Sequence, residues 1–347
     1  MSGSLGPLGW AWPRNIAGNA IGWGADGVTL ANIPMESRNL YYFDAVGDGV
    51  TDDTDAVQAA FDWVAGGGLA GRALNITSGQ YLLLDKVSVT VPNHTTVALH
   101  GSGGQAGTIL VGNATGGIEL LCSGSAPFVT VEKFAIVPAM AGAGFLLRVK
   151  GTYSGSGGGI GHNTVVVRDM EFSPLQRTTS TYYSLNPLDF EKMKRPYIER
   201  IVYRPGTQAP AYYGDYLVNL SDCYSPVIKD YVLGGYARIG IKAHHSVATE
   251  GFLSSHGRLT NCLRGIWYQS SPQPGVIIEN THINSSEGNI IIDGAQRFRV
   301  SGNLLYSNNS KVFSWTRSGN TLTVTCDPDS GGVSQTNHNI ANGLDVR

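Results

Sequence analysis

The stretch "FDAVGDGVTDDTDAVQAAFDWV", residues 43–64, decides the fold, and it holds six aspartates in a chain of which only 14% is charged. Aspartates at this density either bind a metal ion or shape the backbone. Their spacing does not match the calcium loop D-x-[DN]-x-[DN]-G-x₅-E. Asp44 and Asp48 stand beside small residues and glycine, a composition typical of turns. We therefore predict a folding device here, with neither a metal site nor a cofactor.

The second half of this stretch predicts a capping helix near residues 52–65. Asp52 is the expected N-cap, and Asp53 and Asp55 fall in the first turn, where the helix dipole favours negative charge. Glycines 66–68 follow as a stop. The apolar residues that recur at helical spacing are Val57, Ala60, Phe61 and Val64. We expect this helix to cover an open end of a β structure, because uncovered strand edges recruit other strands.

The composition limits the function classes. The chain has 347 residues, of which 42% are hydrophobic, and a net charge of −2. It lacks the basic excess of a nucleic-acid-binding protein, and no apolar run approaches the roughly 20 residues that cross a bilayer. We expect no nucleic-acid partner and no membrane insertion. The scattered cysteines lack a C-x-x-C spacing and indicate buried free thiols; they are Cys122, Cys223, Cys262 and Cys326.

A short apolar pattern followed by a bend residue recurs from residue 129 to about residue 310. Its repeated apolar positions are Val131, Val167, Ile198, Ile228, Leu259, Ile278 and Val300. Two residues later stand Lys133, Asp169, Arg200, Asp230, Asn261, Asn280 and Gly302. Most of these bend residues are Asp, Asn or Gly, which tolerate a left-handed backbone. Repeats of about 20–30 residues, made of strands and bends, predict a parallel β-solenoid.

Each repeat carries an earlier strand, and alternate residues of a strand face opposite sides. We expect these residues inside the solenoid: Leu188, Phe190, Leu220, Ile239, Ile241, Ile266 and Ile292. Their neighbours should face outward and stack about 4.8 Å apart from turn to turn. The predicted outward pairs are Asp189 with Glu191, Asn219 with Ser221, Lys242 with His244, Trp267 with Gln269, and Ile291 with Asp293.

The opening motif also carries a resemblance. "YFDAVGDGVTDDTDAVQAAFDWV" and the following "LNITSGQYLLLDKVSVTVPNHTTVALHGSG" resemble the N-terminal cap and first coils of the pectate-lyase-like superfamily, as in bacteriophage tailspikes and capsule depolymerases. The close part of the resemblance covers residues 41–104, and the later repeats agree only in pattern. It implies an all-β fold, a right-handed parallel β-helix with a short N-terminal capping helix, and a homotrimer.

The resemblance implies a tailspike-like protein on the surface of a virion or phage-like particle, outside the host cell. Such a protein binds a bacterial surface polysaccharide and cleaves it, as a glycoside hydrolase or a polysaccharide lyase. The same fold also serves non-catalytic receptor-binding and structural spikes. The sequence leaves open both the type of reaction and the choice between enzyme and spike.

Three segments follow from this interpretation. Residues 1–38 form an N-terminal arm, which either docks to other particle proteins or packs as a strand on the cap. Residues 39–311 form the β-helix. Residues 312–347 contain a β-hairpin module, which neighbouring chains complete or which is truncated.

Aromatic residues mark one candidate glycan-binding region. Long inserts between strands often carry function, and two of them bring Tyr182, Tyr183, Tyr212 and Tyr213 to the rim of one wall. Trp267 and Asp293 face outward on that wall. Aromatic rings stack on sugars, so these six residues are candidate substrate-binding groups. Packing between subunits explains the aromatic residues equally well.

The candidate catalytic residues lie on the same wall. Asp189 and Glu191 are about 6.7 Å apart along one strand, within the range for an acid and a base that flank a glycosidic bond. Lys242 and His244 lie two turns away, roughly 10 Å, where they suit β-elimination. Asp215, beside the tyrosine-rich insert, is a further candidate. The alternative for every one of these residues is a solvated side chain without a catalytic role.

Overall fold

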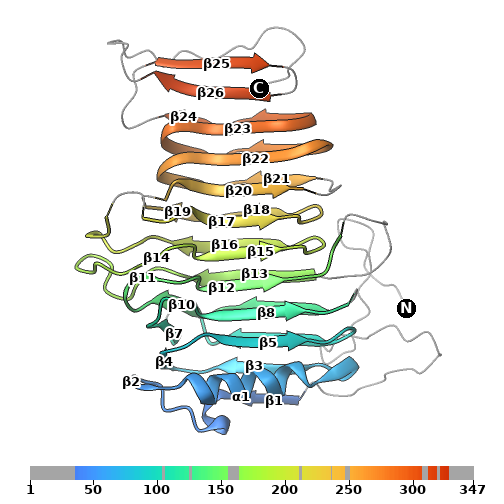
Figure 1. The fold of residues 1–347 in the computed structure, drawn as a ribbon. Coiled ribbons are helices and arrows are strands. Elements are labelled where there is room, and N and C mark those ends of the chain that lie inside the picture. The colour runs from blue at the N-terminus through green and yellow to red at the C-terminus, as the bar shows by residue number, and fades with distance from the viewer. Residues whose placement is uncertain are drawn as a thin grey trace, which may run out of the picture.

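The computed structural model of the chain describes residues 36–327, apart from 104–105, 125–126, 155–163, 211–212, 236, 247–250, 307–311 and 319–320. The chain winds as a right-handed parallel β-helix, and each full turn passes through three walls of parallel strands (Figure 1). The all-β parallel β-helix predicted from the sequence is therefore confirmed, whereas the homotrimer stays a prediction. Tyr212 lies outside the described residues, as do residues 1–35 and 328–347.

Three walls of stacked strands make up the solenoid. Wall 1 contains β5 (Val87–Val91), β8 (Ile118–Cys122), β12 (Leu147–Lys150), β15 (Leu188–Glu191), β17 (Tyr216–Ser221), β20 (Ile239–His245) and the middle of β22 and β23. Wall 2 contains β1 (Glu36–Asn39), β3 (Arg72–Ile76), β6 (Thr96–Gly101), β9 (Phe128–Glu132), the starts of β13 (Thr164–Glu171) and β16 (Tyr197–Tyr203), β18 (Val227–Lys229), β21 (Phe252–Ser255) and the ends of β22 and β23. Wall 3 contains β2 (Asp48–Asp52), β4 (Gly79–Leu83), β7 (Gly107–Val111), β10 (Ala135–Pro138), the ends of β13 and β16, β19 (Val232–Gly234), the starts of β22 and β23, and β24 (Leu304–Tyr306).

The remaining elements lie at the ends and on the loops. Two long strands, β22 (Arg258–Glu279) and β23 (His282–Ser301), each run through all three walls. In the loops between wall 3 and wall 1, β11 (Ala141–Ala143) pairs with β14 (Tyr183–Ser184). The antiparallel strands β25 (Val312–Ser318) and β26 (Thr321–Asp327) follow the solenoid, and β26 also pairs with β23. The predicted domain boundary at residue 312 stays a prediction.

The interior is formed by the inward ladder that alternation predicts. All seven side chains expected inside wall 1 are buried, from Leu188 at 0% exposure to Ile239 at 8%. Burial raises the pKa of the inward thiols Cys122 and Cys262 to about 12. The buried apolar side chains of successive turns contact one another and form one continuous core from Leu40 to Val300. Removal of this apolar surface from water stabilises every turn.

The bends between wall 2 and wall 3 hold left-handed residues. Every predicted bend residue has a positive φ, from 49° at Arg200 to 65° at Gly302, and all except Asn261, which follows wall 3, lie in these bends. Lys133 and Arg200 adopt this backbone although their residue types disfavour it. The turn geometry, rather than residue preference alone, therefore fixes these positions.

One repeat was assigned to the wrong wall. Ile228 stacks on Ser254, which stacks on Ile278, whereas Leu259 stacks on Leu233 in wall 3. The sequence pattern missed Ser254 because its position inside the core is normally apolar. The buried Ser254 hydroxyl is satisfied by the Tyr231 hydroxyl, 2.8 Å away.

Helix α1 (Thr54–Ala65) packs on the first turns of the solenoid and lies across their N-terminal end (Figure 1). Its buried face contains Val57, Ala60, Phe61 and Val64, as the helical spacing predicts. The short 3₁₀ helices η1 (Leu40–Phe43) and η2 (Gly68–Ala70) flank this segment. The N-cap is Asp53, one residue later than predicted, because Asp52 still belongs to β2.

The aspartate-rich loop is held by its own carboxylates. Asp48 accepts hydrogen bonds from the N–H groups of Val50 and Thr51, which lower its pKa. Asp52 accepts bonds from the hydroxyl and N–H of Thr54, and the hydroxyl bond is the main cause of its lowered pKa. Each carboxylate accepts hydrogen bonds from backbone N–H groups of its own turn, so these aspartates stabilise the fold of the loop.

Asp53 is the most consequential residue of this loop. It is 2% exposed, and its two oxygens accept the N–H groups of Val46 at 2.6 Å and Gly47 at 3.1 Å. Asp53→Ala should lower the free energy of unfolding by about 2 kcal/mol, because two N–H groups lose their partner. Urea unfolding measures this. The exposed Asp55→Asn is the control, and a loss for Asp53→Ala no larger than for the control would contradict the assignment.

Candidate functional site

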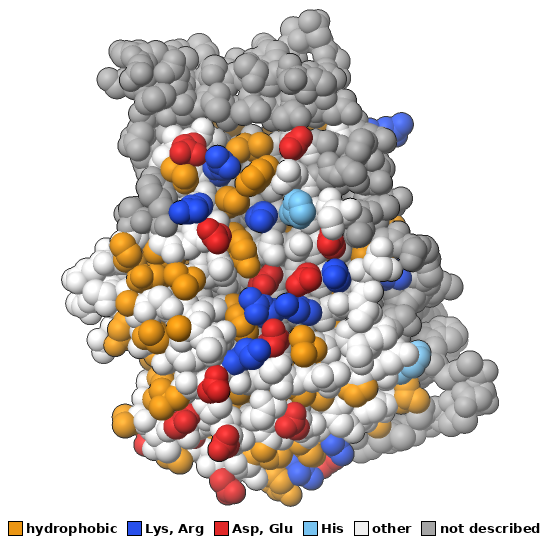
Figure 2. Space-filling view, in the orientation of Figure 1, with side chains coloured by type: hydrophobic (Ala, Val, Ile, Leu, Met, Phe, Trp, Pro, Cys, Tyr) orange, Lys and Arg blue, Asp and Glu red, His pale blue; other side chains and the backbone are white. Residues whose placement is uncertain are grey.

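Wall 1 faces the viewer in Figure 1, and two ladders of outward side chains run along it. Ladder A consists of Ser88, Glu119, Arg148, Asp189, Asn219, Lys242, Trp267 and Ile291. Ladder B consists of Thr90, Leu121, Lys150, Glu191, Ser221, His244, Gln269 and Asp293. The five predicted outward pairs thus stack in successive turns, in the predicted order. Figure 2 shows acidic and basic side chains interspersed over this face.

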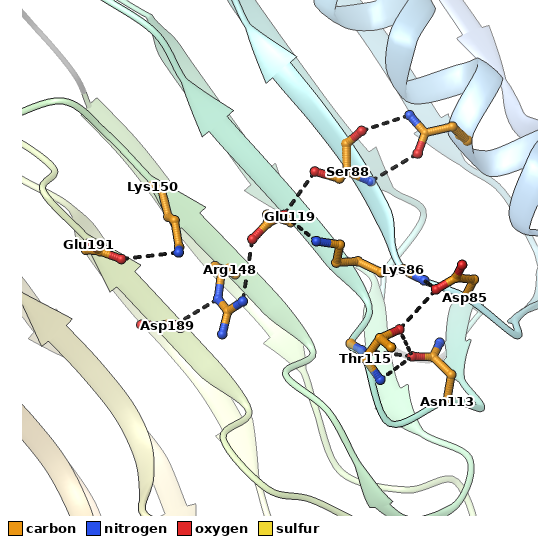
Figure 3. Close-up of polar contacts among 12 residues, drawn as sticks. Asp85, Lys86, Ser88, Asn113, Thr115, Glu119, Arg148, Lys150, Asp189 and Glu191 are labelled. Carbon is orange, nitrogen blue, oxygen red and sulfur yellow. Dashed lines mark hydrogen bonds and ion pairs between the residues drawn. The ribbon is translucent and has the colours of Figure 1, made fainter.

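The lower half of ladder A is a continuous polar network (Figure 3). Glu119 accepts Lys86 Nζ and Ser88 Oγ, at 2.8 and 3.0 Å. Arg148 lies between two carboxylates, with Nε 2.8 Å from Asp189 and Nη1 3.5 Å from Glu119. The side chains of Glu119 and Asp189 are each only 8% exposed, so this ion-pair network is largely shielded from water.

The charge state of Glu119 depends on its partners. Burial alone raises the pKa of Glu119, but the Lys86 and Ser88 hydrogen bonds and the positive charges of Lys86 and Arg148 lower it further than burial raises it. Glu119 is therefore held ionised. The repeat pattern does not mark this residue, because the pattern begins only at residue 129. The alternation in "IELLC", residues 118–122, is the signal that marks it.

Asp189 and Glu191 differ sharply in surroundings. Both oxygens of Asp189 are engaged, by Arg148 Nε and by Asn219 Nδ2, each at 2.8 Å. Burial and the neighbouring Asp189 charge raise the pKa of the Tyr216 hydroxyl. Glu191 has a 31% exposed side chain and looser partners, Lys150 Nζ at 3.4 Å and Lys192 Nζ at 3.8 Å. Of the two, Glu191 is the carboxylate that a ligand on the wall can reach.

The basic candidates lie two turns beyond this pair. Lys242 stacks two strands from Asp189, and His244 stacks two strands from Glu191, roughly 10 Å between Cα atoms. Both side chains are partly exposed, and among the described residues neither has a side-chain hydrogen bond or ion pair. On ladder B, His244 lies two strands from Glu191 on one side and two strands from Asp293 on the other.

The aromatic candidates fall into two groups. Trp267 is outward on ladder A beside Lys242, and the Arg264 guanidinium lies 5.2 Å from its ring centroid. Tyr183 and Tyr213 pack on each other with centroids 4.3 Å apart, and the Tyr213 hydroxyl meets that of Tyr203 at 3.0 Å. These two rings hold the loops together.

Tyr182 is 43% exposed on the same loops, where Figure 2 shows hydrophobic side chains gathered near β11 and β14. Among the candidate tyrosines that the structure describes, Tyr182 is the most open to a ligand.

Asp293 is on ladder B four strands from Glu191, about 19 Å. Asp215 lies at the start of β17, four residues from Asn219 or about 13 Å along the strand, and pairs with Arg238 at 3.6 Å. Neither aspartate reaches the position of Glu191.

His245 faces the interior at the end of β20. It is 3% exposed, neither ring nitrogen has a hydrogen-bond partner among the described residues, and its ring centroid lies 5.4 Å from that of Tyr268. Burial lowers the pKa of His245 to about 4; the nearby Asp222 charge opposes this shift and His244 adds to it. His245 is therefore a structural residue that is neutral in the fold, while its neighbour His244 faces outward.

Replacing His245 with phenylalanine should flatten the acid dependence of stability. The folded-state pKa is depressed below the ordinary value of about 6.5. The unfolded chain therefore binds more protons between these values, and stability falls as pH decreases from about 6.5 to about 4. The expected wild-type loss over that range from this residue is about 3 kcal/mol. Urea unfolding at several pH values measures it, with the exposed His94→Gln as control; equal slopes for His245→Phe and wild type would refute this account.

No group of three or more acidic, histidine or cysteine side chains in the described part of the chain is arranged to hold a metal ion. The described residues likewise contain no helix with the length and apolarity that a membrane span requires; α1 has 12 residues.

The comparisons with known proteins concern the fold. No family model and no curated protein matches the sequence. Among solved structures, the ORF18 protein of Geobacillus virus E2 matches with 11% identity and a TM-score of 0.44, over 79% of this chain and 53% of that one. This chain thus spans about half of the ORF18 protein.

Two further structures match over 79% of this chain. The A-module of the mannuronan C-5 epimerase AlgE4 from Azotobacter vinelandii has 17% identity, 89% coverage of its own length and a TM-score of 0.39. Tailspike protein 2 of the Escherichia coli O157:H7 bacteriophage CAB120 has 10% identity, 43% coverage and a TM-score of 0.29. From its own strand topology, the chain is a right-handed parallel β-helix protein with a charged outer wall.

Proposed function

We propose that this protein is a tailspike-like protein that binds a bacterial surface polysaccharide along wall 1 and cleaves it. One observation carries the proposal: ladder B presents a partly exposed carboxylate, Glu191, and, two turns away, His244, whose side chain has no partner in the described part of the chain. Lys150 lies one turn from Glu191 on the other side. Such a row offers acid, base and cationic groups to a polymer that lies along the solenoid axis.

The proposed chemistry is general acid–base cleavage. Glu191 and His244 exchange protons with the groups around one glycosidic bond, with one group donating to the leaving oxygen and the other accepting a proton. In hydrolysis the accepted proton comes from water. In elimination it comes from the carbon beside a uronate carboxylate, whose charge Lys150 or Lys242 would neutralise. Asp189 is assigned a positioning role, because Arg148 and Asn219 already engage both of its oxygens.

Binding outside the catalytic pair is assigned to the aromatic groups. Trp267 on wall 1 and Tyr182 on the adjacent loops are proposed to stack on sugar rings. We further propose a homotrimer displayed on a virion or phage-like particle, with the segment that precedes β1 as the docking arm. Sedimentation of the full chain tests the trimer.

A second candidate is a non-catalytic receptor-binding or structural spike. The engagement of Asp189 favours it, because only one carboxylate of the predicted pair remains accessible. Incubation with a panel of capsular and O-antigen polysaccharides separates the two functions. Release of reducing ends indicates hydrolysis, and ultraviolet absorbance of an unsaturated uronate indicates elimination. Binding without either product identifies the spike, and the absence of both binding and product for every glycan would overturn the proposal.

A further inference from the structure

Three arginines near wall 3 have no partner in the described part of the chain. Arg177 lies in the loop after β13, Arg204 directly follows β16, and Arg258 begins β22. None of the three guanidinium groups has a hydrogen bond or ion pair to a described residue, and the Nε of Arg177 is buried without a partner. By contrast, eight other arginines have ion pairs: Arg38, Arg72, Arg148, Arg168, Arg200, Arg238, Arg264 and Arg299.

The strand register brings these arginines to one place. Val202 stacks on Val232, which stacks on Arg258, so the strand ends of β16, β19 and β22 are neighbours. Arg204 continues beyond Val202 to lie over Gly234, with its Cγ 3.8 Å from where a Cβ of that glycine would be. The loop of Arg177 joins the same region, because its carbonyl accepts the N–H of Thr207 at 2.9 Å.

The charges in this region do not cancel. Burial and the positive charges of Arg177 and Arg258 lower the pKa of Arg204, against the opposing charge of Glu171. Burial and Arg258 also lower the pKa of His282, which stacks next to Arg258. Glu171, whose charge raises the pKa of Arg204, already accepts the N–H of Ser173 at 3.0 Å. Among the described residues, the positive charge of this region is therefore not matched by acidic partners.

Gly234 lets its neighbours pack closely around it. Gly234 is buried, and a Cβ at this position would lie 2.9 Å from the Thr260 hydroxyl, so a side chain there would collide with the next strand. Arg204, which follows β16, and Thr260 of β22 therefore lie close to this glycine from either side, and Thr260 is two residues from Arg258.

We propose that Arg177, Arg204 and Arg258 form an anion-binding site on wall 3 that takes the carboxylate or sulfate groups of an acidic polysaccharide. Planar guanidinium groups bind such anions through paired hydrogen bonds. Arg204 and Arg258 are separated by two strand spacings and by two residues along the strand, about 12 Å between Cα atoms, which suits repeated charges of a polymer better than one small ion. The choice of a glycan rests on the proposed function, whereas the anion site does not.

Three dextrans with one backbone test the charge requirement: neutral dextran, carboxymethyl dextran and dextran sulfate. Wild-type protein should bind the two charged polymers and not the neutral one, with affinity falling as salt rises. The double variant Arg204→Gln/Arg258→Gln should bind them at least tenfold more weakly. Arg195→Gln, which removes an arginine in the turn between walls 1 and 2 that has no ion pair to a described residue, should stay within twofold of wild type.

The outcomes separate the site from its ligand and from the wall 1 proposal. Preference for carboxymethyl dextran over dextran sulfate assigns carboxylate, and the reverse preference assigns sulfate. Equal binding of neutral dextran by wild type, or unchanged binding by the double variant, would overturn the site. Tighter binding of a single-stranded oligonucleotide than of both charged dextrans would overturn the glycan assignment. Charged-dextran binding without cleavage of any bacterial glycan would leave the anion site standing and contradict only the wall 1 cleavage.

Discussion

Glu191→Gln is expected to reduce glycan cleavage at least a hundredfold while the protein stays folded and still binds the glycan. Glutamine keeps the size of the side chain but neither donates nor accepts a proton at the working pH, and a positioned acid–base group contributes about 10²–10⁴ in rate. The partners of Glu191 are solvent-facing lysines at 3.4 and 3.8 Å, so little stability depends on its charge. Product release under saturating glycan measures the effect.

The matched control is Glu279→Gln on wall 2. Glu279 is also an outward, partly exposed glutamate paired with a cation, Arg299, but it lies on a different face from ladder B. Its substitution should leave cleavage unchanged. Cleavage by Glu191→Gln at the wild-type rate would remove this residue from the mechanism, even if the protein proves to be a depolymerase.

His244 supplies an independent check on the same step. If His244 exchanges the second proton, His244→Gln should lower the rate and also remove one limb of the pH–rate profile, which a merely structural role would not do. Cleavage with an unaltered pH profile would leave Glu191 without its proposed partner.

The fold could be predicted from the sequence because every turn of a solenoid requires the same kinds of residue at the same positions. Inward positions such as Phe190 and Ile241 have to be apolar, and bends such as Asp230 need a left-handed residue. The predicted alignment of the repeats was wrong in the one turn where the inward residue is polar. Ser254 fills an inward position with a hydroxyl, so the apolar pattern passes over it and Leu259 takes its place in the alignment.

The outward residues of wall 1 could also be predicted. Alternate residues of a strand face outward, and each turn adds one residue to each outward ladder, so the stacking order follows from the sequence. The hydrogen-bond and ion-pair partners of each outward side chain could not be predicted. Asp189 is neutralised by Arg148, which precedes it by 41 residues because a long insert lies between their strands. The spacing rule that gave the Asp189–Glu191 pair carries no information about the strand below. Accessibility, which separates Glu191 from Asp189, depends on that neighbouring strand.

Arg148→Met is expected to cost about 4 kcal/mol in the free energy of unfolding. The guanidinium is the shared partner of Glu119 and Asp189, whose side chains are each 8% exposed. Breaking a buried ion pair by removing one member leaves an uncompensated charge, which costs more than the pair itself contributes. Methionine keeps an unbranched apolar side chain but also removes the guanidinium carbon that lies 4.0 Å from the Phe145 ring centroid, so the loss includes this cation–π contact.

The exposed pair Arg200–Asp169 provides the control. The Arg200 side chain is 46% exposed and Asp169 is 32% exposed, and the second partner of Arg200, Glu199, keeps Lys229 at 2.9 Å, so Arg200→Met should cost about 0.5 kcal/mol. Urea unfolding at neutral pH compares both variants with wild type. Similarly small losses of unfolding free energy for Arg148→Met and Arg200→Met would mean that the charges of the wall 1 network are solvated and contribute little to stability.

The acid dependence of the Arg148→Met effect follows from Glu119. Its folded-state pKa is lowered, so the stability it contributes is present above the ordinary carboxylate pKa of about 4.3 and is lost as pH falls through the folded value. Without Arg148 one cause of that lowering disappears. The stability gap between wild type and Arg148→Met should therefore be widest at neutral pH and narrow in acid, whereas a gap caused only by altered packing would stay constant with pH.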